Sequence, residues 1–175
     1  TTLFKLQFEI NINDKIIIFL IMKNKYINIY NNLVNLTRNK DLYKNFTTKD
    51  SFSDRLILFL LHFAFFLKVY KKDDKKIIQE IYDYIFIQLE ISIREVGHGD
   101  VSINKNMKIY INLFHSMLIK VEKWDKINQE DKSKVIQSLL NLKNKQYDLS
   151  VYFDKYKVEL EKNALNFYIK SVINH

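Results

Sequence analysis

Glycine and proline are almost missing from this chain, and that shortage limits what it can fold into. Its 175 residues include two glycines, no proline and no cysteine. Sheets and doubly wound folds need many tight turns, which usually draw on glycine and proline. Two glycines cannot build a Rossmann dinucleotide site or a P-loop. Without cysteine, the chain has no disulfide, iron–sulfur cluster or thiol nucleophile. The composition therefore favours helices.

From Met22 onward, apolar residues recur at the three- and four-residue spacing of amphipathic helices. Helix caps are predicted at Asp73 and Asp74, and at Asn128 together with Asp131. The first predicted helix starts at residue 22. The other predicted helices cover residues 51–70, 73–96, 100 to about 124, 128 to about 143, and 149–172. The length is typical of one domain. The sequence therefore predicts a single all-α domain, a multi-helix bundle.

The segment 51–70 is predicted to be the central helix of this bundle. Ser51 and Asp54 form an S-x-x-D capping box at its start. Its middle is apolar on every face except at His62, which is most simply a satisfied core histidine. Positive charge at its far end suits the negative pole of the helix macrodipole, and it is supplied by Lys68, Lys71 and Lys72.

The first 21 residues differ in character from the rest. Apolar and polar residues alternate from Leu6 to Ile12 with the period of a β-strand. An apolar run, Ile16 to Met22, follows, and it falls far short of the roughly 20 residues that span a bilayer. One hypothesis is that Met22 is the natural start. Residues 1–21 would then be an atypical extension that is not native, followed by one helical domain over 22–175.

The chain is basic, with 28 Lys and Arg against 20 Asp and Glu, a net charge of +8. Such a surface favours anionic partners, for example nucleic acid or acidic lipid. Nearly all the basic residues are lysine, however, and most lysines fit solvated helix faces. No RRM, KH or zinc-finger signature is present, so no specific DNA binding is predicted. Non-specific RNA contact stays open as an alternative.

Both glycines of the chain fall in one charged segment, residues 93–108. One interpretation is a helix stop and a tight turn, in which Asp100 caps backbone N–H groups. The other is a binding surface, because the segment carries more charge than a turn requires. A third, minor interpretation makes His98 an acid–base residue. None of the four histidines lies in a metal-binding motif, and neither a metal nor another cofactor is predicted.

Two groups of residues resemble the ubiquinol–cytochrome c chaperone family, from about Ile29 to Trp124. The first group comprises Tyr30, Thr37, Arg38, Leu42, Tyr43, Ser53, Asp54, Arg55, Leu61 and His62. The second comprises Leu89, then Arg94-Glu95-Val96-Gly97-His98-Gly99-Asp100, then Lys105-Asn106-Met107-Lys108. The chain departs from the family at Phe114-His115-Ser116, where the family tends to have an aromatic-glycine-arginine run.

The resemblance implies a non-enzymatic assembly factor that binds newly made cytochrome b and promotes assembly of the ubiquinol–cytochrome c reductase, complex III. It also implies a cytoplasmic location, or the mitochondrial matrix in a eukaryote, with peripheral contact to the inner membrane. A ribosome or a small partner protein would be a further partner. A basic helical RNA- or ribosome-binding protein is the alternative.

The candidate partner-binding residues are Asp54, Arg55, His62, Arg94, Glu95, Gly97, Gly99, Asp100, Lys105, Met107 and Lys108. Two pairs of neighbouring residues in this set can instead be interpreted as structural. Ion pairs within the domain, Asp54 with Arg55 and Arg94 with Glu95, would fix the two helices in place.

Overall fold

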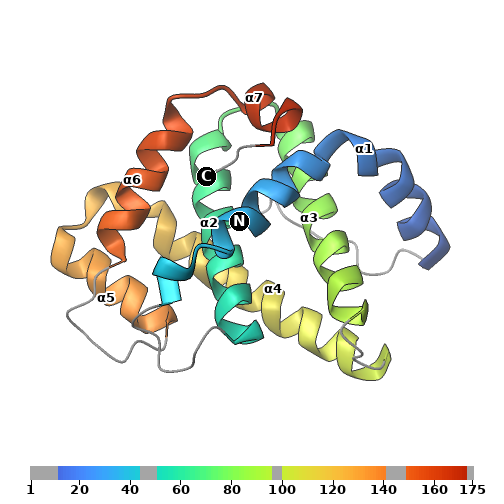
Figure 1. Ribbon diagram of the computed structural model, residues 1–175, viewed down its shortest axis with the longest axis horizontal. Helices are drawn as coiled ribbons and strands as arrows, with labels where there is room; N and C mark the ends of the chain where they lie inside the picture. The colour runs from blue at the N-terminus through green and yellow to red at the C-terminus, as the bar shows by residue number, and fades with distance from the viewer. Residues whose placement is uncertain (1–11, 44–50, 96–99, 141–148, 173–175) are drawn as a thin grey trace.

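The computed structural model describes residues 12–43, 51–95, 100–140 and 149–172, with the backbone alone for 12–16, 18–24, 100 and 101. Every regular element in these residues is helical, which confirms the predicted all-α class (Figure 1). The α-helices are α1 (Ile12–Thr37), α2 (Phe52–Tyr70), α3 (Lys75–Glu95), α4 (Asp100–Glu122), α5 (Gln129–Leu139), α6 (Ser150–Glu161) and α7 (Leu165–Lys170). Two short 3-10 turns are η1 (Lys40–Tyr43) and η2 (Trp124–Lys126).

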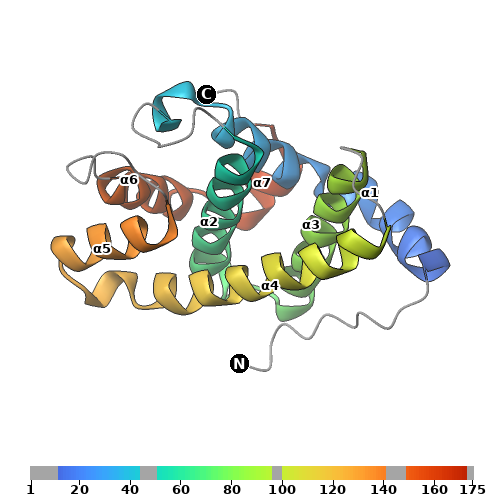
Figure 2. The same ribbon diagram turned by 90° about the horizontal axis from the view of Figure 1, so that it is seen from below.

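Helix α2 forms the centre of the core, as its sequence predicts. Every residue from Leu58 to Leu67 is buried. Helices α1, α4 and α6 pack around it, and Figure 2 shows α4 running along one side of the bundle. The rings of Phe63 and Phe114 stack at 5.2 Å between centroids, joining α2 to α4. Burial of one large apolar side chain contributes about 1.5–3 kcal/mol, so a helix buried on all faces anchors the whole fold.

The predicted helix caps of α2, α3 and α5 are present. Ser51 and Asp54 form the reciprocal capping box of α2. Asp74 Oδ1 accepts from the backbone N–H of Lys76 at 2.8 Å, at the start of α3. The Asn128 side chain accepts from Asp131 N–H at 2.9 Å, at the start of α5. Each cap satisfies N–H groups that a helix leaves without intrahelical partners.

The first helix begins earlier than predicted. It starts at Ile12 and crosses Met22 without a break, so the strand expected to end at Ile12 is wrong at that residue. Residues 1–11, which carry the rest of the alternating pattern, lie outside the described part. A helix satisfies its backbone groups internally, whereas one strand needs a partner. The N-terminal part of α1 extends beyond the other helices, and Ile17 is 55% exposed (Figures 1 and 2).

The single helix predicted over residues 149–172 is two helices, α6 and α7. Ala164 is extended, with φ −71° and ψ 153°, and ends the helical path. The Tyr70 hydroxyl lies 2.7 Å from the carbonyl oxygen of Leu160 and 2.9 Å from that of Asn163. It therefore supplies a donor to carbonyls at the end of α6 and in the turn that follows it. The change of direction brings α7 against α1.

Candidate functional site

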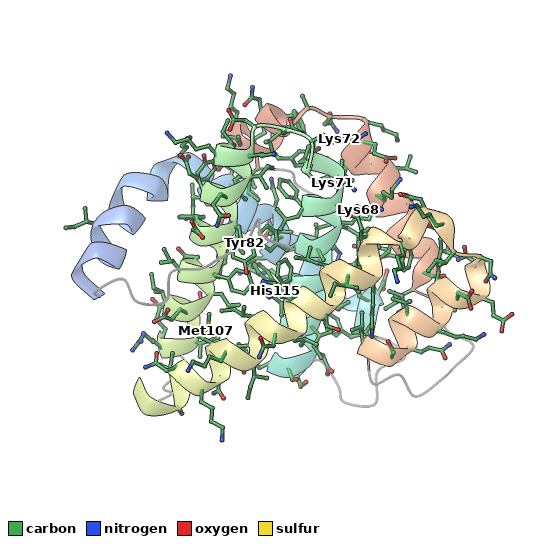
Figure 3. The ribbon with its side chains drawn as sticks, turned by 180° about the vertical axis from the view of Figure 1, so that it is seen from behind. Lys68, Lys71, Lys72, Tyr82, Met107 and His115 are labelled. Atoms are coloured by element: carbon green, nitrogen blue, oxygen red, sulfur yellow. The ribbon has the colours of Figure 1, made fainter. Side chains whose placement is uncertain are left out.

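The charged corner predicted from the sequence lies where α3 ends and α4 begins, at one end of the bundle (Figure 1). Buried side chains hold both helices at this place, namely Ile93 of α3 and Ile103 and Met107 of α4. Figure 3 places Met107 between the two helices. Met107 is therefore part of the core. Residues Glu95, Lys105 and Lys108 are exposed beside these anchors, and we call these three the corner charges.

Arg94 pairs within its own helix. Its guanidinium lies 2.8 Å from the Glu90 carboxylate, and the two side chains are 33% and 16% exposed. The ion-pair partner predicted from the sequence was Glu95, whereas the structure pairs Arg94 with Glu90. The i,i+4 spacing of Glu90 and Arg94 was the signal that could have identified it. Arg94 is thus positioned at the rim of the corner by an intrahelical ion pair.

The centre of the corner signature lies outside the described residues. Gly97, His98 and Gly99 are not described, and for Asp100 the structure gives the backbone alone, as the first residue of α4. Their predicted roles stay predictions.

Asp54 and Arg55 lie in the first turn of α2. Asp54 is 5% exposed. Its carboxylate accepts from the Ser51 hydroxyl at 2.7 Å and from the Ser51 N–H at 3.3 Å. Arg55 is exposed. Asp54 therefore serves the helix start, whereas Arg55 is accessible to a partner.

His62 lies in the core and not at the surface. Its side chain is fully buried, and both ring nitrogens have partners within the chain. Nδ1 lies 2.7 Å from the carbonyl oxygen of Leu58, which can only accept, so Nδ1 carries the proton. In the neutral ring, Nε2 then accepts from the Tyr152 hydroxyl, also at 2.7 Å. Tyr152 is separated from His62 by 90 positions, and no sequence signal indicated it.

His115, at the position where the chain departs from the family pattern, joins α4 to α3. Its Nε2 lies 3.0 Å from the Tyr82 hydroxyl, and the two rings stack with an interplanar angle of 18°. Figure 3 shows the pair between the two helices. Burial lowers the pKa of His115 below its ordinary value of 6.5. The neutral ring is therefore favoured, and its Nε2 shares one hydrogen bond with the Tyr82 hydroxyl, whose donor depends on the imidazole tautomer.

Lys68 lies in the last turn of α2, as predicted, and both Lys68 and Lys71 also contact other elements. Lys68 reaches α4 and η2, where its Nζ donates to the Glu122 carbonyl oxygen at 3.1 Å and pairs with Asp125 at 2.9 Å. Lys71 pairs with the Glu122 carboxylate. These two lysines therefore attach α2 to the end of α4, and Lys68 places its charge at the C-terminus of α4 as well as its own helix. Figure 3 shows Lys68, Lys71 and Lys72 along the end of α2.

Within the described residues, no group of three or more His, Asp or Glu side chains is placed to hold a metal ion. None of the described helices combines the length and apolar content needed to cross a membrane.

By fold, the chain is an all-α protein built on one apolar central helix, with a charged corner between its third and fourth helices. Residues 44–123 match the family model described as ubiquinol–cytochrome C chaperone. The match confirms the family resemblance predicted from the sequence. The matched segment begins after Tyr43, so the residues from Tyr30 to Tyr43 that also resemble the family lie outside it. All the candidate partner-binding residues lie inside it. Comparison with curated proteins and with solved structures found no match.

Proposed function

We propose that the chain is an assembly chaperone of the ubiquinol–cytochrome c reductase that binds newly made cytochrome b. The observation that carries this proposal is the family match over residues 44–123. That segment contains α2, α3 and α4, which supply the central core and both sides of the corner. The match supports a chaperone role in complex III assembly in general, and it implies a non-enzymatic protein. Cytochrome b as the client is the finer part of the proposal.

The corner charges, with Arg94 and Arg55, are the proposed gripping surface. Glu95, Lys105, Lys108 and Arg55 are exposed, and Arg94 is half-buried. Exposed charges give orientation and specificity to a protein contact more than they give affinity. The buried anchors beneath, such as Ile103, hold the helices that carry these charges. Charged side chains carried on two packed helices fit recognition of one defined partner segment.

Variants of the corner test this proposal in cells whose own copy of the gene is deleted. We expect Arg94→Ala and Asp100→Ala to lower the amount of assembled reductase, measured by native gel and ubiquinol oxidation, while the chain stays folded. Glu90→Gln is the matched control, because it removes the intrahelical pair and keeps the Arg94 charge. If Glu90→Gln lowers assembly as much as Arg94→Ala does, Arg94 acts through the pair rather than on a partner.

A second pair of variants separates position from net charge. Lys105→Ala with Lys108→Ala should lower assembly, whereas Lys72→Ala with Lys75→Ala removes equal charge from exposed residues elsewhere and should not.

Unfolding of both Arg94→Ala and Asp100→Ala would make the corner a scaffold and end the site assignment. His98→Ala should leave assembly unchanged. Loss of function in that variant would favour an acid–base role instead.

A further inference from the structure

A cavity of about 310 Å³ lies between α1, α2, α6 and α7, away from the corner. Its described lining residues are Ile29, Asn32, Leu33, Leu36, Phe66, Tyr156, Glu159, Asn163, Phe167 and Tyr168. Of these, Phe66 alone falls within residues 44–123, so the family match does not account for the cavity. The inference below is independent of the proposed chaperone role.

Hydrogen bonds hold the α7 wall of this cavity in place. The side-chain amides of Asn28 and Asn32, on α1, donate to the carbonyl oxygens of Ile169 at 3.0 Å and Ser171 at 2.9 Å. At the other end of α7, the Tyr70 hydroxyl contacts the turn that follows α6. Because α7 is attached on both sides, its wall does not depend on a ligand for its position.

The lining is mainly apolar, and its charged member is acidic. Glu159 is exposed, and its carboxylate pairs with Lys162 at 2.7 Å. None of the described lining residues is basic. Phe167, 41% exposed, lies in the lining and also reaches solvent. An anionic ligand would find no positive charge in this lining, so an uncharged molecule fits best.

The Tyr156 hydroxyl is a polar group of this lining. In the described part of the chain, no hydrogen bond is formed by this hydroxyl, although the ring contacts His62 and Phe153. Burial raises the pKa of Tyr156 well above its ordinary value of 10.0, so the hydroxyl keeps its proton and can donate. A bound acceptor can therefore receive this hydrogen without displacing a hydrogen bond within the described residues.

We propose that this cavity binds a small, uncharged, largely apolar molecule whose single hydrogen-bond acceptor receives the Tyr156 hydroxyl. Benzene occupies engineered apolar cavities of about 150 Å³. A cavity of about 310 Å³ therefore matches a molecule of roughly two fused rings. Binding a molecule of this kind would couple α1 to α6 and α7, which supply nearly all of the lining.

Prodan, an uncharged naphthyl ketone, is a suitable probe, because its fluorescence reports both polarity and hydrogen bonding to its carbonyl. We expect saturable binding of one prodan per full-length chain. Leu36→Trp places a larger side chain in the lining and should weaken binding at least tenfold. Leu113→Trp makes the same change at a half-buried leucine of α4, outside the lining, and should leave binding unchanged.

Tyr156→Phe tests the hydrogen bond itself. It should weaken prodan binding by about three- to tenfold, the worth of one hydrogen bond, and shift the emission of the bound probe to the blue. Tyr110→Phe, on α4, is the matched control. Failure to saturate, or equal affinity and emission in wild type, Leu36→Trp and Tyr156→Phe, would overturn the proposal. If the Leu36→Trp variant loses its helical circular dichroism, the test rests on the emission of prodan bound to the Tyr156→Phe variant. An emission maximum that is not shifted from that of wild type would then overturn the proposal.

Discussion

The Tyr82–His115 pair places a titratable ring between the two helices that meet at the corner. Burial lowers the pKa of His115 below 6.5, so the folded chain binds a proton at this site less readily than the unfolded chain. Where the unfolded state binds more protons, the free energy of unfolding falls as the pH falls. The stabilising contribution is therefore complete above the unfolded pKa and declines from there toward the folded pKa.

We predict that acidification from about pH 7 to pH 5 lowers the free energy of unfolding of wild type more than that of His115→Gln. Glutamine keeps a hydrogen-bonding group near Tyr82 but does not titrate. Urea unfolding of both proteins across this range measures the difference. The other three histidines are common to both proteins and drop out of the comparison. Parallel pH profiles would contradict the assignment.

The site residues show how far sequence reasoning reaches at this scale. A histidine inside an apolar helix could be recognised as a core residue, and His62 is one. Its partner Tyr152 could not be, because a contact across 90 positions is set by how α6 packs on α2. Arg94 and Glu90 are different, since their i,i+4 spacing alone brings them together.

At the scale of elements, the capping box at the start of α2 fixes where the central helix begins. The Ser51 hydroxyl accepts from Asp54 N–H at 3.2 Å and donates to the Asp54 carboxylate at 2.7 Å. Asp54 therefore has a structural role that competes with its proposed role in partner binding. The two roles predict different effects of substitution.

We expect Ser51→Ala and Asp54→Ala each to lower the free energy of unfolding by about 0.5–2 kcal/mol, the usual worth of an N-cap. The double variant should lose less than the sum, because the two side chains form one motif. Thermal or urea unfolding measures both effects. Ser53→Ala, at an exposed serine of the same turn, is the control and should change little. An Asp54→Ala variant of unchanged stability that fails to support reductase assembly would favour a direct contact with a partner.

Helix positions were predicted well where side-chain chemistry is local. The caps of α2, α3 and α5 follow from single polar residues next to apolar stripes. The break between α6 and α7 was missed, because Ala164 carries no local stop signal. At that break, the Tyr70 hydroxyl approaches from α2, and α7 packs against α1. Tertiary contacts of this kind leave no periodic trace in the sequence.

For the whole molecule, the net charge of +8 is the feature that most favours the alternative, an RNA- or ribosome-binding protein. Several lysines are, however, already paired within the fold. Lys68 and Lys157 both contact Asp125, and Lys132 contacts Asp154 at 2.8 Å. Paired lysines contribute less to phosphate binding than free ones. If phosphate contacts dominate, the binding affinity should fall by about 10³- to 10⁵-fold between 50 and 200 mM salt. The affinity of an apolar contact with a client should not fall in this way.

Capture of the tagged chain after crosslinking in its own cells, read by mass spectrometry at about 50 and 200 mM salt, tests the central claim most directly. We predict that cytochrome b is recovered at both salt concentrations, and that Arg94→Ala lowers its yield while Glu90→Gln does not. Recovery of ribosomal proteins and RNA alone, lost at the higher salt, would contradict the chaperone proposal. The family resemblance would then describe the fold and not the activity.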